Sequence, residues 1–180
     1  MKLAKDLETR DVESYLEKYE EEWSIHDKEK FHEMHDILSK NKCLNLCQLY
    51  QIALWKTKRS SKIVKHNPDE VVKGITELAL KLTDERFKVR CLCVLKGIGI
   101  PRASAILAMY DPKRYGVIDV NAWYALTGKK KVSFNDEDWI YYLEQIRRLA
   151  RKHAKTPREI DMALMKYGQK LMKKGEEVIR

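Results

Sequence analysis

Residues 86–110 read RFKVRCLCVLKGIGIPRASAILAMY, and this stretch decides the fold expected for the chain. Apolar residues recur at helical spacing before Gly97 and after Pro101, so we expect two helices joined by a tight turn. Gly97 and Gly99 are suited to a positive φ and let the backbone approach a partner closely. The backbone amides of the turn and of the second helix's first residues would then be available to bind a phosphate.

The residues around this turn indicate a surface that grips a nucleic-acid backbone. Ile98 would anchor the turn in the protein, while the flanking basic side chains would add phosphate contacts. An ordinary helical hairpin, whose glycines only make a tight turn, is the alternative. The DNA contacts predicted for the hairpin are Lys96, Gly97, Ile98, Gly99 and Arg102.

An aspartate follows the hairpin at a fixed distance. Asp119 lies in the segment 117–121, VIDVN, which follows the second helix of the hairpin. Its position before an apolar helical stretch also makes it a good N-cap residue. The two roles are compatible, because a capping carboxylate is held in place.

Together, residues 95–104 (LKGIGIPRAS) and 117–121 resemble the helix-hairpin-helix superfamily of base-excision DNA glycosylases, which includes endonuclease III. The resemblance implies an all-α, glycosylase-like fold of roughly eight to ten helices around a central helix-hairpin-helix. It also implies that Asp119 is the catalytic residue, which would stabilise positive charge on the sugar as the base departs. Asn121 stands where the family has a histidine and could still contact a phosphate.

One departure from the family pattern bears on the reaction. The branch of the family that also cleaves the DNA strand carries a lysine in the hairpin, and the corresponding residue here is Pro101. A proline cannot form a Schiff base. The resemblance therefore implies a monofunctional enzyme that releases the base with water, unless a displaced lysine takes over.

A glycosylase also needs a pocket for a base that has left the helical stack. Trp55, Trp123 and Tyr110 are candidates for stacking on that base, although each is also a plausible core residue. We expect no cofactor and no metal, because no cysteine follows Cys93 and the cysteine loop that binds an iron–sulfur cluster in endonuclease III is missing.

The rest of the chain has the periodicity of helices. Asn67 and Thr156 each precede a proline and are expected to cap a helix, and Gly168 or Gly175 is expected to mark the fraying end of the last one. A short strand is possible only at residues 115–120. Further helices are expected at about residues 4–22, 27–39, 42–57, 86–96, 120–127 and 136–153.

Charge divides the chain into two parts. Residues 1–40 carry a net charge of −5, and residues 41–180 carry +14. We therefore expect an acidic helical N-terminal extension (1–40) packed on a basic helix-hairpin-helix domain (41–180), with nucleic acid as the partner of the basic part. A Lys- and Glu-rich surface of the kind found in heat-adapted proteins is the alternative. A second DNA contact is expected in the run of residues 55–65, at Lys56, Lys58 and Arg59.

The sequence thus predicts a cytoplasmic, nucleoid-associated, monomeric DNA glycosylase of base-excision repair. Its partner would be double-stranded DNA with a damaged or mismatched base, and no membrane is expected, because no apolar run is long enough to cross one. Two alternatives stay open: a DNA-binding protein that has the hairpin without catalysis, and a bifunctional glycosylase and lyase that uses a displaced lysine.

Overall fold

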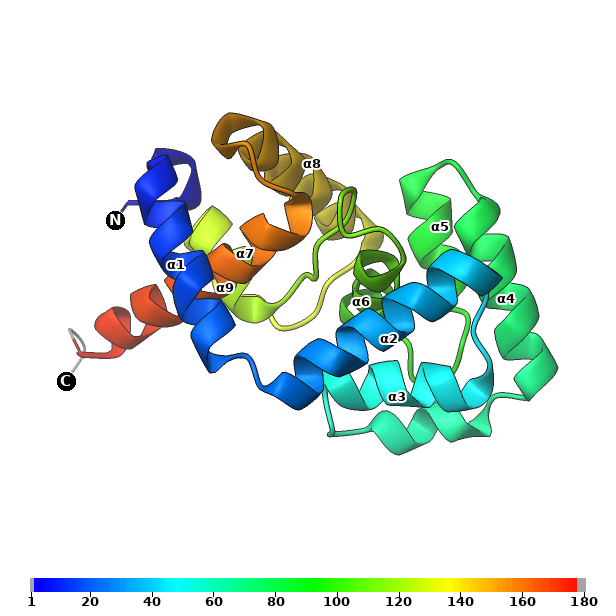
Figure 1. Ribbon diagram of the computed structural model, residues 1–180. Coiled ribbons are helices and arrows are strands. Elements are labelled where there is room, and N and C mark those ends of the chain that lie inside the picture. The colour runs from blue at the N-terminus through cyan, green and yellow to red at the C-terminus, as the bar shows by residue number, and fades with distance from the viewer. Residues whose placement is uncertain (1, 178–180) are drawn as a thin grey trace.

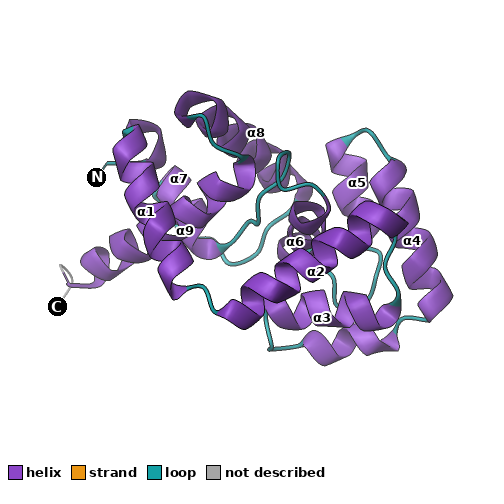
Figure 2. Ribbon diagram, viewed as in Figure 1, coloured by secondary structure: helices purple, strands orange, loops and turns teal. Residues whose placement is uncertain are grey.

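The computed structural model of the protein describes residues 2–177, and within them it is helical without strands (Figures 1 and 2). The all-α prediction is confirmed: the described residues form nine α-helices and two short 3-10 helices. In chain order the elements are η1 (Ala4–Asp6), α1 (Thr9–Glu22), α2 (Ile25–Asn41), α3 (Leu46–Lys56), η2 (Ser61–His66), α4 (Asp69–Lys81), α5 (Glu85–Leu92), α6 (Ile100–Tyr110), α7 (Val120–Thr127), α8 (Asp136–His153) and α9 (Pro157–Glu177).

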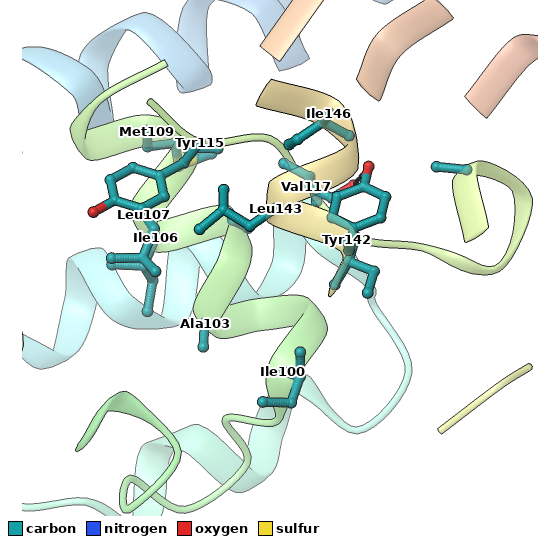
Figure 3. Close-up of a cluster of buried hydrophobic side chains, with 14 of the residues drawn as sticks. Ile100, Ala103, Ile106, Leu107, Met109, Tyr115, Val117, Tyr142, Leu143 and Ile146 are labelled. Atoms are coloured by element: carbon teal, nitrogen blue, oxygen red, sulfur yellow. Dashed lines mark hydrogen bonds between the residues drawn. The ribbon is translucent and has the colours of Figure 1, made fainter. Parts of the chain in front are cut away.

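Helix α6, the second helix of the hairpin, lies at the centre of the fold. Every residue from Arg102 to Met109 is buried, because other helices pack around it. A helix that is buried on all sides needs small or apolar residues throughout, and the sequence ASAILAM supplies them. Figure 3 shows part of this core, in which Ile106 and Leu107 of α6 lie near Leu143 of α8.

The N-terminal helices connect two groups of helices. Helix α1 packs along α9, which also contacts α7 and α8, whereas α2 packs against α3 and α6. Figure 1 shows α1 and α2 following one another across the molecule from one group to the other. Residues 1–40 thus contact both groups, while the domain boundary proposed after residue 40 stays a prediction.

Several local predictions can be compared with the structure directly. Helices α7 and α8 have the predicted bounds, and Thr156 caps α9 in a reciprocal capping box with Glu159. The short strand that was possible at residues 115–120 does not form: residues 115–119 are a loop whose Val117 and Ile118 amides bond to side chains, and Val120 begins α7. Gly168 does not mark a helix end, because α9 continues through it to Glu177.

None of the helices described between residues 2 and 177 has the length and apolar character needed to span a lipid bilayer.

Gly168 is required because α7 and α9 touch through their backbones. A Cβ added at Gly168 would lie 1.9 Å from the carbonyl oxygen of Asn121, an atom that cannot move without shifting α7. We expect Gly168→Ala to lower the free energy of unfolding by about 3 kcal/mol, since overpacking strains the backbone. The measurement is the midpoint of urea unfolding.

The control for this prediction is Gly74→Ala in α4, where an added Cβ would meet nothing within 4 Å. That variant should gain about 0.5–1 kcal/mol from higher helix propensity. Equal stability of the two variants would contradict the close contact between α7 and α9.

Candidate nucleic-acid interface and acidic site

The hairpin turn uses its two glycines differently. Gly97 has a φ of +79°, and a Cβ there would lie 3.0 Å from the side chain of Val64, so this position requires glycine. Gly99 has an extended backbone (φ −103°) and is exposed as the N-cap of α6, so the expectation of a positive φ is wrong for it. Ile98 and Ile100 are buried on either side of Gly99 and anchor the turn as expected.

Asn67 stabilises the turn from outside the hairpin. The expectation that it caps the next helix is wrong, since Pro68 is the N-cap of α4. Its side chain instead accepts a hydrogen bond from the Lys96 amide (2.8 Å) and donates one to the Lys96 carbonyl (2.9 Å). The backbone of Lys96 is therefore fixed, while its side chain is exposed to solvent.

Arg102 has a different role from the one predicted. It is only 9% exposed, and its guanidinium donates hydrogen bonds to the carbonyl oxygens of Gly97 (2.6 Å), Thr57 (3.1 Å) and Arg59 (2.9 Å). A guanidinium with these inward partners joins the hairpin to the basic run instead of contacting a phosphate. The exposed side chains of Lys58 and Arg59 are thereby held beside the hairpin.

The segment that leads to Asp119 is attached to three helices. The Ile118 amide donates to Ser104 Oγ on α6 (3.1 Å), the Val117 amide donates to Asp161 on α9 (2.7 Å), and Tyr142 on α8 donates to the Val117 carbonyl (3.2 Å). These contacts fix the position of the following residue relative to the hairpin helix.

Asp119 is the N-cap of α7, as its local sequence predicts. Its Oδ1 accepts a hydrogen bond from the Ala122 amide at 2.8 Å, and its side chain is half-buried. Charge interactions link it to Lys56 at the end of α3 and to Asp161 of α9. The carboxylate therefore belongs to a cluster of charged groups drawn from α3, α7 and α9.

A buried ion pair stands behind this cluster. Arg158 Nη1 lies 2.6 Å from Asp161 Oδ1, and both side chains are at most 6% exposed. Burial raises the pKa of Asp161 to about 6, although Arg158 and the Val117 amide oppose the rise, so the carboxyl is ionised at pH 7. Neither residue stands out in the sequence, because an Arg and an Asp three residues apart resemble an ordinary surface pair on a helix.

Aromatic rings surround the Arg158 guanidinium. The rings of Tyr19, Trp23, Phe31 and Trp55 have their centres within 5.1–5.7 Å of its central carbon. Three of these rings come from α1, α2 and the link between them, so the acidic N-terminal segment helps to build the surroundings of the site. Contact with aromatic faces partly offsets the cost of burying the guanidinium.

An open cavity of about 720 Å³ lies between the start of α2 and the end of α3. Trp55 and Lys56 line it, together with Thr57 and Lys58 of the basic run. Of the three aromatic residues proposed to stack on a base, only Trp55 is in this cavity. Its indole donates a hydrogen bond to the Asp27 carbonyl (3.2 Å), which holds the ring in place.

The remaining candidates lie elsewhere. Trp123 is buried against Phe134 and Tyr141, and Tyr110 packs under the ammonium of Lys42. Asn121 is half-buried where α7 meets α9. Trp123, Tyr110 and Asn121 do not line the cavity, so neither Trp123 nor Tyr110 shares a pocket with Trp55.

Metal ligands do not gather in the described part of the chain: no group of three His, Cys, Asp or Glu side chains there is arranged to hold an ion. His35, which could form half of a metal site with His32 by spacing, contacts the Met109 carbonyl through its Nδ1 (2.7 Å).

Comparison of the chain with protein-family models, with curated proteins and with solved structures found no match.

The ion pair leads to a prediction about pH. Replacing Arg158 with methionine removes the cation that opposes the raised pKa of Asp161, so that pKa should rise further above 6. A raised carboxyl pKa in the fold means that stability is present at low pH and is lost as pH rises through that value. Urea unfolding should show a loss of about 3 kcal/mol at pH 8 and a smaller loss at pH 5.

The control is the double variant Arg158→Met with Asp161→Asn, which leaves no buried carboxylate. It should lose most of the extra pH dependence of the single variant. A single variant whose loss of stability is the same at both pH values would contradict the coupling between the two residues.

Proposed function

We propose that this protein is a DNA glycosylase that cleaves the N-glycosidic bond of a damaged or mismatched base flipped out of duplex DNA. The observation that carries the proposal is the hydrogen bond from the Ile118 amide to Ser104 Oγ. It couples the helix that begins at the hairpin turn to the residue before Asp119. A surface suited to holding a DNA backbone is thereby set at a fixed distance from a half-buried carboxylate.

The proposed grip on DNA combines backbone amides with positive charge. Gly99 is exposed at the N-terminus of α6, where the helix dipole favours an anion. The side chains of Lys96, Lys58 and Arg59 are exposed around it. These groups would contact phosphates and fix the protein on the duplex without selecting a sequence.

The flipped nucleotide would enter the cavity beside Trp55. An aromatic ring favours stacking on any base, and the cavity volume of about 720 Å³ lies in the range usual for ligand sites, about 300–1,000 Å³. Asp119 would then stabilise positive charge on the sugar as the base leaves. Because Pro101 offers no amine, the hairpin itself supports attack by water and not by a lysine.

The role of Asp119 can be tested without removing the helix cap. Asparagine caps a helix as well as aspartate does, so Asp119→Asn should fold normally. It should release bases about 100-fold more slowly or not at all, because the developing charge has lost its carboxylate. The assay is base release from duplexes that carry oxidised, deaminated, alkylated or mismatched bases, followed by alkali treatment.

Asp84→Asn is the matched control, since Asp84 caps α5 through the Arg86 and Phe87 amides and belongs to no part of the proposed site. It should keep the wild-type rate. If wild-type protein binds DNA and releases no base from any duplex, the hairpin serves DNA binding without catalysis.

If the exposed amides at the N-terminus of α6 bind a phosphate, a side chain at Gly99 should weaken DNA binding. An added Cβ would meet only Pro101 Cδ, at 4.0 Å, so Gly99→Ala should fold, at a cost of about 1 kcal/mol because alanine is a poorer N-cap than glycine. The methyl group would stand in front of the exposed amides and weaken DNA binding by about tenfold, which corresponds to about 1.4 kcal/mol. Fluorescence anisotropy with duplexes of several sequences is the measurement, and an unchanged dissociation constant would exclude this surface as the contact.

A further inference from the structure

Lys56 stands apart from the other lysines near the cavity. It is the last residue of α3, and its half-buried side chain lines the cavity next to Trp55. Lys30 lines the same cavity, but its Nζ is bound to Glu33 (2.6 Å) and Gln51 (2.7 Å). Among the side chains that the structure describes, no hydrogen bond or ion pair engages the Nζ of Lys56.

The surroundings of Lys56 increase the share of its amine that is neutral at a given pH. Burial lowers the pKa of its ammonium below the usual value, and Arg158 adds to this shift, while Asp119 and Asp161 oppose it. The neutral amine is the form that attacks carbon, and a lysine in such surroundings is suited to be a nucleophile. The other charged and titratable groups that line the cavity are His26, Asp27, Lys30 and Lys58.

We propose that Lys56 Nζ is the amine nucleophile of this protein and forms a Schiff base with C1′ of the target deoxyribose. The proposal rests on the proposed function and replaces water by an amine in the attacking step. It places the nucleophile at the end of α3, where it interacts electrostatically with Asp119, and not in the hairpin, where Pro101 offers no amine.

The reaction balances without any further reactant except water. The amine attacks C1′, the C1′–N bond breaks, and the base leaves with the electron pair and takes up a proton, offset by the proton that the attacking nitrogen releases. The C1′–O4′ bond then opens as O4′ takes a proton, which leaves a protonated imine. Loss of a C2′ proton expels the 3′-phosphate with the electrons of the C3′–O bond, and water hydrolyses the imine to free Lys56.

Two nearby lysines are less suited to this role. Lys58 and Lys96 are both exposed to solvent, whereas Lys56 is half-buried at the cavity wall. Their positions suit phosphate contacts. The half-buried position at the cavity wall, the free Nζ and the interaction with Asp119 come together at Lys56.

The test uses an oligonucleotide duplex with a preformed abasic site, so that base recognition is not required. Wild-type protein and sodium borohydride should give a covalent protein–DNA complex, because borohydride reduces the imine. Lys56→Arg keeps the positive charge but removes the primary amine, and should lower the yield by about 100-fold. Lys28→Arg is the matched control: Lys28 is a half-buried lysine of α2 whose Nζ binds the Glu20 carbonyl, and its variant should keep the full yield.

Peptide mapping of the complex and a pH profile complete the test. The modified peptide should contain Lys56, and the trapping rate should rise with pH around a midpoint below the value of about 10.4 for an ordinary lysine. No trapping by the wild-type protein, undiminished trapping by Lys56→Arg, or modification at another lysine would overturn the proposal. If the protein releases the base but the DNA strand breaks only after alkali treatment, the amine nucleophile is excluded and the glycosylase function stands.

Discussion

The ion pair between Arg158 and Asp161 is the interaction on which the arrangement of the site depends. Two buried charges are stable only when each has partners. Arg158 finds them in the carboxylate and in the aromatic rings around its guanidinium, which α1, α2 and α3 supply. Asp161 finds a second partner in the Val117 amide. The pair therefore connects the N-terminal helices, α9 and the segment before Asp119.

Close packing around α9, which carries both members of the ion pair, explains two glycines and the position of the acidic segment. Gly116 has no side chain because a Cβ there would lie 2.7 Å from Asp161 Oδ2. Gly168 lets α9 approach α7 so closely that the start of α7, where Asp119 caps it, has little freedom. Helix α1 packs along α9 and contributes Tyr19 to the surroundings of Arg158. The negative charge of residues 1–40 thus belongs to a segment that is structural as well as acidic.

Side chains of the hairpin shape the turn, whereas side chains at the end of α3 line the cavity. Gly97 and Arg102 shape the turn from within, which leaves the exposed amide end of α6 and the side chain of Lys96 facing solvent. The proposed reaction requires an aromatic ring that stacks on the base and an amine that attacks the sugar. Trp55 and Lys56, at the end of α3, place both groups at the cavity wall. The hydrogen bonds from Arg102 to the carbonyls of residues 57 and 59 hold the hairpin and the end of the cavity wall in a fixed relative position.

The sequence by itself determined the helical fold, the bounds of α7 and α8, the hairpin turn and the cap at Asp119, because periodicity and capping depend on neighbouring residues. It misjudged Arg102 and Asn67, because their partners at Thr57, Arg59 and Lys96 lie 29 to 45 residues away in the chain. Only the tertiary structure decided that Arg158 and Asp161 are buried and that Lys56 shares a charged cluster with Asp119. Long-range burial and electrostatics depend on which helices meet, and no local pattern specifies that.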